Sequence, residues 1–133
     1  MVILYDRFNL PEDVFEVIFA TEQQIIVAKE LIRFMISNEG ELTKTLMSLI
    51  ATQLHDGQYE CLMESGQFKG KKVKLSYNKR QFYDRILTPM KAMGMIDYDL
   101  YKKTYRLSTK FSNDMMSIGI KWKERLRKMG FSV

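Results

Sequence analysis

The sequence predicts a mostly helical α+β domain with one small β-hairpin. Apolar residues recur at steps of three and four through most of the chain. This period changes to two between residues 95 and 107, and helical spacing returns between residues 111 and 129. The 133 residues include 46% hydrophobic and 28% charged residues but only two prolines. This composition is typical of one ordinary folded domain, so we expect residues 1–133 to form a single unit.

Three helices are expected in the N-terminal part, residues 1–57. Pro11, followed by two acidic residues, suits a first helical turn because no backbone donor is needed there and the acids complement the helix dipole. Thr21 followed by Gln24 fits a capping box, and helical spacing then continues to a stop at Gly40. A third helix follows directly and ends at Gly57. Its predicted apolar stripe consists of Leu42, Leu46, Leu49, Ile50 and Leu54.

The segment between the third and fourth helices gives a weaker pattern. The sequence does not predict one structure for residues 58–70, and a turn of helix around residues 59–64 is one option. Residues 71–76 alternate apolar and basic side chains in their second half, which is typical of a short, half-exposed strand. We therefore expect one strand before the next helix.

A fourth helix is expected between residues 78 and 93. Asn78 followed by Gln81 repeats the capping pattern, and Gly94 is a natural C-terminal stop. Pro89 lies inside this helix, where proline removes a backbone donor and clashes with the preceding turn. We expect either a kink or a break into two short helices with Thr88 as the second cap.

A β-hairpin is expected at residues 95–108. Two alternating runs flank a short turn, and Lys102 and Lys103 lie at its tip. The side chains predicted to share its inner face are Ile96, Tyr98, Tyr105 and Leu107.

The C-terminal part, residues 109–133, predicts a helix with a near-heptad apolar seam. The seam can pack on its own domain, or it can pair with the same helix of a second copy and form a homodimer. Attachment to a membrane surface is a third reading that Trp122 allows, but Gly119 and the short apolar length argue against it. The seam, which is also the predicted dimer interface, consists of Phe111, Met115, Ile118, Trp122, Leu126 and Met129, with Arg125 as the alternative to Leu126.

Charge divides the chain into two unlike parts. Residues 1–60 contain four Lys/Arg and ten Asp/Glu, a formal charge of −6, whereas residues 61–133 contain 17 and six, a charge of +11. Such a basic part attracts polyanions, and nucleic acid is the commonest one inside a cell. An acidic protein or membrane, and a merely solubilising surface, are the alternatives.

Enzymatic and metal sites are not expected. With one cysteine and one histidine the chain lacks the ligands of a zinc cage, and no glycine-rich phosphate loop occurs. Cys61 is expected to be a buried, inert thiol and His55 a histidine at a helix end. We expect no cofactor. No signal peptide or long uncharged apolar stretch is found, so a soluble cytoplasmic protein is expected.

The fourth helix and the hairpin together match a known pattern. A basic helix at residues 78–87 precedes Met90, Met93, Gly94 and an apolar pair, and residues 97–108 end in Tyr-Arg-Leu-Ser. This order resembles the winged helix-turn-helix family of DNA-binding proteins, with extra N-terminal helices and a C-terminal helix. The chain differs from that family in Pro89 and in the long segment before the fourth helix.

The resemblance implies double-stranded DNA binding by a small dimeric transcriptional regulator. Residues 78–93 would be the recognition helix in the major groove, and residues 95–108 the wing. Arg80 or Lys79 would read guanine and Gln81 adenine, while Tyr77, Tyr83 and Arg85 would bind phosphate. A protein-interaction or assembly module without base readout, and binding of structured RNA, are the alternatives. The expected DNA contacts are Lys71, Lys72, Lys74, Lys79, Arg80, Gln81, Tyr83, Arg85, Lys102, Lys103 and Arg106.

Overall fold

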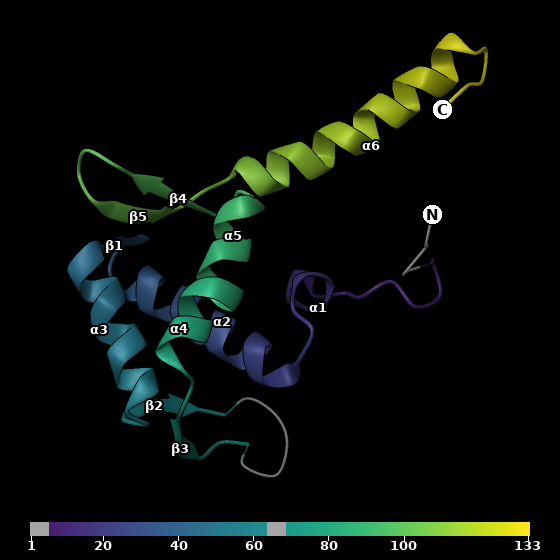
Figure 1. Cartoon of the computed structure of the whole chain (residues 1–133). Helices are drawn as coiled ribbons and strands as arrows, with labels where there is room; N and C mark the ends of the chain where they lie inside the picture. The colour runs from purple at the N-terminus through teal and green to yellow at the C-terminus, as the bar shows by residue number, and fades with distance from the viewer. Residues whose placement is uncertain (1–5, 64–68) are drawn as a thin grey trace.

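The computed structural model describes residues 6–63 and 69–133 and shows a mixed α+β fold. Helices surround one small antiparallel sheet, a second hairpin lies at the foot of the body, and the last helix extends away from it (Figure 1). The helical segments are α1 (Val14–Ile18), α2 (Glu22–Ser37), α3 (Lys44–His55), α4 (Lys79–Gln81), the π-helical segment η1 (Phe82–Leu87), α5 (Thr88–Ala92) and α6 (Lys110–Lys128). The strands are β1 (Glu41–Thr43), β2 (Tyr59–Leu62), β3 (Lys72–Leu75), β4 (Ile96–Asp99) and β5 (Thr104–Leu107).

The first helix begins later than predicted, whereas the cap predicted for the second helix is present. The carboxylate of Asp13 accepts a hydrogen bond from the Phe15 N–H at 3.0 Å, so Asp13 is the N-cap of α1 and Pro11 lies outside the first turn. The hydroxyl of Thr21 accepts a hydrogen bond from the Gln24 N–H at 3.2 Å. The helix α2 ends where Gly40 adopts a φ of +81°, a left-handed conformation that glycine adopts without strain.

The third helix is shorter than predicted. Leu42 is buried in β1 rather than on α3, and Thr43 caps α3 through a hydrogen bond from the Leu46 N–H at 3.1 Å. Leu49 is 46% exposed, whereas Met47 is fully buried, so the predicted stripe was wrong at this position. The buried face of α3 consists of Met47, Ile50, Ala51 and Leu54, and Leu49 lies outside it.

The main sheet has the strand order β1-β5-β4, and both pairs are antiparallel. Tyr98 lies opposite Tyr105, and Ile96 lies opposite Leu107, which confirms the predicted hairpin and its inner face. The predicted strand at residues 71–76 is confirmed as β3. It pairs with β2, so the helical option for residues 59–64 is wrong for residues 59–62. Glu64 and residues 65–68 lie outside the described residues.

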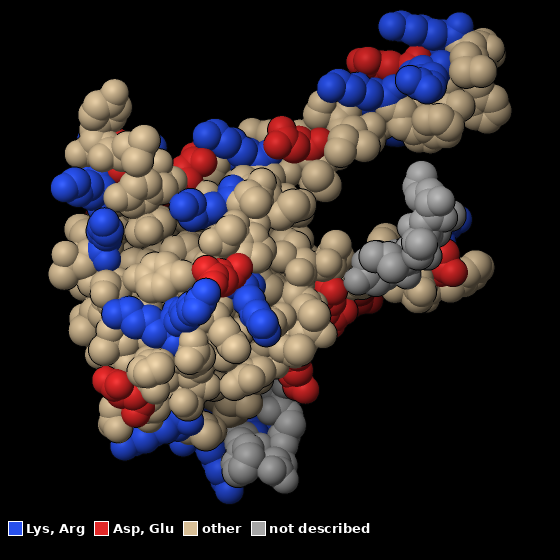
Figure 2. All heavy atoms as spheres, in the orientation of Figure 1, with Lys and Arg blue, Asp and Glu red and all other residues tan. Residues whose placement is uncertain are grey.

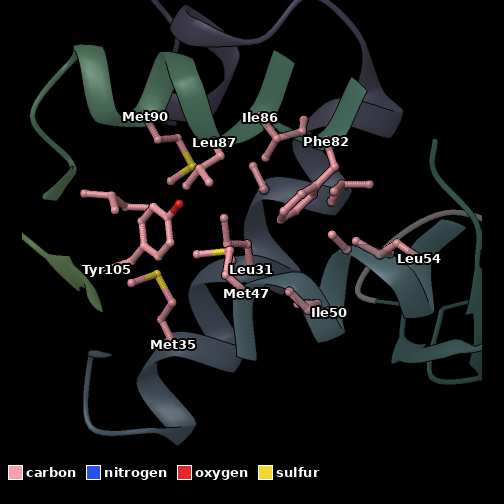
Figure 3. Packing of buried hydrophobic residues seen from close by; sticks show 14 of the residues in the cluster. Leu31, Met35, Met47, Ile50, Leu54, Phe82, Ile86, Leu87, Met90 and Tyr105 are labelled. Carbon is pink, nitrogen blue, oxygen red and sulfur yellow. The ribbon is translucent and has the colours of Figure 1, made fainter. Parts of the chain in front are cut away.

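One apolar core joins α2, α3, the fourth helical segment and the main sheet. Phe82, Ile86 and Met90 point from one side toward Leu31 and Met47 on the other (Figure 3). All five side chains have no exposed surface. The fourth helical segment is therefore held along its length by the helices beneath it.

Candidate nucleic-acid interface

The fourth helical segment, residues 79–92, has one buried and one exposed face. Its N-terminus is capped as predicted, because the Asn78 side chain accepts a hydrogen bond from the Gln81 N–H at 3.1 Å. Phe82, Ile86, Leu87 and Met90 are buried in the core. The opposite face presents six exposed residues to solvent: Arg80, Gln81, Asp84, Arg85, Thr88 and Lys91.

Pro89 is accommodated by a π-helical segment rather than by a break. The backbone N–H and the hydroxyl of Thr88 both bond to the carbonyl oxygen of Tyr83, the latter at 2.8 Å. Thr88 has helical dihedrals, so the prediction that it caps a second helix was wrong. A π-turn suits the position before proline, because the wider turn moves away the backbone carbonyl with which the proline ring would otherwise clash.

Lys79 does not extend from the exposed face. Its ammonium donates to the Thr52 hydroxyl at 3.0 Å and lies 3.4 Å from the Ser48 hydroxyl, both on α3. Its backbone N–H donates to Nδ1 of His55 at 3.1 Å. Of the two residues expected to read guanine, Lys79 therefore lies against α3, where neighbouring hydroxyl groups are within its reach. His55 contributes to the cap of the next helix and is a structural group here.

Charges of both signs lie on the exposed face. Figure 2 shows Lys and Arg side chains over α4 and η1, with acidic side chains among them. Arg80 Nε is 3.7 Å from the carboxylate of Asp84, and both side chains are largely exposed. Such a surface pair contributes at most about 1 kcal/mol, so Arg80 is free to exchange this contact for another anion.

The predicted tyrosine contacts differ in accessibility. Tyr77 is only 6% exposed and belongs to the core, so the expectation that it binds phosphate was wrong. Tyr83 is half-buried, with its ring edge against Phe82 at a centroid distance of 5.5 Å. Tyr83 therefore offers only part of its ring to the surface.

The β4–β5 turn presents two exposed lysines, Lys102 and Lys103, beside the start of α3. The carboxylate of Asp99 organises the turn by accepting hydrogen bonds from the N–H groups of Tyr101 at 2.9 Å and Lys102 at 3.1 Å. The bond from Lys102 is the main cause that lowers the pKa of Asp99. The carbonyl of Lys103 accepts a hydrogen bond from the Lys44 N–H at 3.0 Å, which fixes the turn to α3.

Arg106 occupies a different setting. It lies opposite Asp97 on β4 and opposite Glu41 on β1, so carboxylates flank it on both neighbouring strands. Lys110 pairs with the same Asp97 at 3.0 Å. The charge of Arg106 is therefore partly balanced within the sheet, unlike that of Lys102 and Lys103.

An open cleft of about 660 Å³ lies between α3 and the β4–β5 turn. Lys44, Ser48 and Thr52 were not predicted from the sequence as parts of this surface. A signal was present, because hydroxyl residues recur at steps of three and four along α3, but only the tertiary fold brings them beside the hairpin turn. The cleft is lined by Thr43, Lys44, Thr45, Ser48, Leu49, Thr52, Lys102 and Lys103.

The third group of predicted DNA contacts lies apart from the exposed helix face and the β4–β5 turn. Lys71, Lys72 and Lys74 are exposed on or next to β3, and Lys74 lies opposite Glu60 of β2. The β2–β3 hairpin lies at the α4 end of the fourth helical segment, whereas β4 and β5 lie at its α5 end (Figure 1). The two lysine-bearing hairpins thus lie at opposite ends of the exposed helix face.

The other reactive side chains form a small buried cluster. Glu30 is only 5% exposed, pairs with Arg33 and accepts a hydrogen bond from the Tyr59 hydroxyl at 3.3 Å. Burial, with the Glu30 charge as a second cause, raises the pKa of Tyr59 to about 12 and also raises the pKa of the Cys61 thiol. A raised thiol pKa disfavours the reactive thiolate. Among the described residues, no three His, Cys, Asp or Glu side chains gather as potential metal ligands.

The α6 helix extends away from the body of the protein (Figure 1). None of its residues is buried, so the alternative in which the seam packs on its own domain is wrong for this structure. Phe111 and Leu126 are half-buried, whereas Trp122 is 59% and Met129 79% exposed. Across residues 6–63 and 69–133, no helix combines the length and the apolar character that crossing a bilayer requires.

Comparison with known proteins identifies no relative of this chain. No protein-family model matches this chain, and no curated protein or solved structure is measurably similar to it.

Proposed function

We propose that this protein binds double-stranded DNA as a winged-helix protein. The order of α2, β1, α3, the helical segment 79–92 and the β4–β5 hairpin is that of the family which the sequence resembles. The strand order β1-β5-β4 supports the same assignment. In this proposal residues 79–92 are the recognition helix, β4–β5 is the wing, and β2–β3 is an insertion between α3 and the recognition helix.

The observation that carries the proposal is the exposed face of residues 79–92. Arg80, Gln81 and Arg85 are all exposed on a helix whose other face is fixed in the core. Rigid support is what base readout needs, since arginine recognises guanine and glutamine recognises adenine through fixed pairs of hydrogen bonds. Lysines flank this face on both sides and would bind phosphates.

The cleft between α3 and the β4–β5 turn extends the proposed phosphate surface. Lys44, Lys102 and Lys103 line it together with the hydroxyl groups of α3. Lysine and hydroxyl groups are common phosphate contacts. Lys79 would act here indirectly, because its ammonium adds positive charge next to the hydroxyls of Ser48 and Thr52.

DNA binding is tested by fluorescence anisotropy of a labelled 30-base-pair random duplex at several salt concentrations. We expect the Arg80→Ala/Arg85→Ala variant to bind more weakly and to reduce the slope of log affinity against log salt by about 1, because Arg85 is the expected phosphate contact of the two and each lost phosphate contact contributes about 0.9. The Arg7→Ala/Arg127→Ala variant is the control, since it removes equal charge from exposed positions outside the proposed DNA and dimer surfaces. No binding of the native chain at low salt, or equal loss in both variants, would overturn the proposal.

One observation favours a second function, the docking of a protein. Asp84 places a negative charge among the arginines, and carboxylates flank Arg106. Mixed charge suits a protein partner better than a uniform polyanion. If duplex DNA does not bind, this face becomes the candidate interface for a protein of complementary charge.

We further propose that the protein is a homodimer joined through α6. None of the six seam residues is buried in the described chain, and Trp122 lies near the centre of the seam as the expected anchor. A dimer would present two recognition helices to two half-sites of DNA.

A further inference from the structure

The α6 seam differs from an ordinary solvent-exposed helix face. Met115, Ile118, Trp122 and Met129 are between 44% and 79% exposed and lie on one side of a helix about 28 Å long at 1.5 Å per residue. Phe131 continues this apolar surface beyond the helix and is 61% exposed. Large apolar side chains clustered in this way indicate a contact surface.

The charges beside the seam are arranged unevenly. At about 100° per residue, Lys110, Asp114, Lys121, Arg125 and Lys128 lie on one flank, between about 60° and 120° from Trp122. The other flank, at similar angles, carries Ser112, Met116, Gly119 and Lys123. The ammonium of Lys110 is paired with Asp97 of the body, so Asp114 is the acid that the first flank presents in its N-terminal half, before the basic C-terminal half.

A parallel pair of α6 helices makes poor use of these charges. In parallel pairing each residue of the seam meets its own copy, so Arg125 lies near Arg125 at the edge of the seam. Asp114 would face Gly119 on the opposite flank of the second helix and would have no cation there.

An antiparallel pair reverses each of these relations. The charged flanks of the two helices then face each other, and Asp114 lies near Arg125 and Lys128 of the second copy, twice per dimer. Lys121 meets its own copy at the centre, which is unfavourable, and Lys110 lies near Lys128 of the second copy with its ammonium already paired with Asp97 of its own chain. A Cβ added at Gly119 would meet no neighbouring atom within 4 Å, so the Trp122 ring of the second copy can approach this part of the helix closely.

We propose that two copies of this chain pair antiparallel along α6. Ile118 of each copy packs against Trp122 of the other, and Phe111 packs against Met129. The two bodies lie at opposite ends of a two-helix bridge whose length of about 28 Å approaches one DNA turn of about 34 Å. This inference deepens the homodimer of the proposed function, but it concerns protein association alone and is tested without DNA.

Disulfide trapping distinguishes the two orientations. Phe111→Cys and Met129→Cys are made in separate copies of the full chain, mixed, oxidised and resolved by mass. The antiparallel pair gives a mixed dimer and little self-linked product, because each new thiol lies near the other variant's thiol. The native chain under the same oxidation is the control for Cys61, which is buried. Self-linked dimers of each variant in excess of the mixed dimer would overturn the antiparallel arrangement.

A second measurement keeps the inference testable if disulfides form poorly. Trp122 is the only tryptophan of the chain, so its emission reports on this seam directly. We expect a blue shift with rising protein concentration at the same midpoint as the mass change in light scattering. Trp122→Ala should weaken dimer formation about 10- to 100-fold, as expected for a central aromatic anchor. A chain that stays monomeric at high concentration, or a dimer insensitive to Trp122→Ala, would overturn the proposal whatever its DNA binding.

Discussion

The helical segment 79–92 and α6 are both basic helices with apolar residues at helical spacing, yet they use these residues differently. In residues 79–92 the apolar side chains are buried against α2 and α3, so the charged face is fixed in place. In α6 no apolar side chain is buried, and most of them are exposed in the described chain. Helical periodicity therefore identifies an apolar face but does not say whether it packs within the chain or between chains.

The largest expected effect is a difference in the free energy of unfolding between a substitution on each of the two apolar faces. Phe82→Ala should lower the free energy of unfolding by about 3–5 kcal/mol, since the ring has no exposed surface and its removal leaves a cavity. Trp122→Ala should change it by less than about 0.5 kcal/mol in the monomer, because the ring is mostly exposed there. Urea unfolding followed by far-UV circular dichroism, at protein concentrations low enough to keep the chain monomeric, measures both.

The comparison fails if the two substitutions destabilise the dilute protein equally. That result would mean that α6 packs on its own domain in solution. A loss at Trp122 that grows with protein concentration would instead confirm that its role lies between copies.

Local signals made much of the fold predictable from the sequence. The caps at Thr21 and Asn78 depend on residues three positions apart, and both hydrogen bonds are present. The β4–β5 hairpin was equally readable, because its alternating runs are joined by a short turn. These features are decided by neighbours in the sequence, which is where sequence patterns are reliable.

Features that depend on distant neighbours were missed. The three-residue β1 is too short to show a period, and it exists because β5 pairs with it. The candidate site shows the same limit. Lys79 and Arg80 are adjacent and both positively charged, but only the fold reveals that the Lys79 ammonium lies against Thr52 while Arg80 is exposed.

A smaller effect concerns alkaline pH and the body that supports residues 79–92. Burial and the nearby Glu30 raise the pKa of Tyr59 from 10.0 to about 12. Because the folded-state pKa lies above the unfolded one, the stabilisation is complete below pH 10 and is lost as the pH rises through about 12. We expect unfolding to become easier over this window in the native chain and less so in Tyr59→Phe.

The measurement is the urea midpoint between about pH 9 and pH 12, with the absorbance of phenolate as a direct titration. Tyr59→Phe removes the titrating hydroxyl and its bond to Glu30 but keeps the ring. Matching pH profiles in the two proteins would show that Tyr59 ionises as freely in the folded chain as in the unfolded one. The α6 helix contains no tyrosine, so any alkaline loosening that begins there has another origin.

The smallest expected effects come from one acidic residue on each helix. Asp84→Asn removes a negative charge from the proposed DNA face, so we expect it to tighten DNA binding about two- to fivefold at low salt. Asp114→Asn removes the charge that would face Arg125 and Lys128 of the second copy, so it should weaken dimer formation by a similar factor. Anisotropy with the random duplex measures the first effect, and light scattering measures the second.

These two isosteric substitutions serve as controls for each other, because both remove one exposed carboxylate and leave the other helix unchanged. Asp84→Asn should leave dimer formation unaltered, and both effects should fade at high salt, since the charges are exposed. If Asp84→Asn instead weakens DNA binding, its carboxylate accepts a hydrogen bond from the DNA, as a cytosine amino group would supply, and the face reads sequence through an acid as well as through arginines. If Asp114→Asn tightens the dimer, Asp114 faces another acid rather than Arg125 and Lys128, and the antiparallel register is wrong.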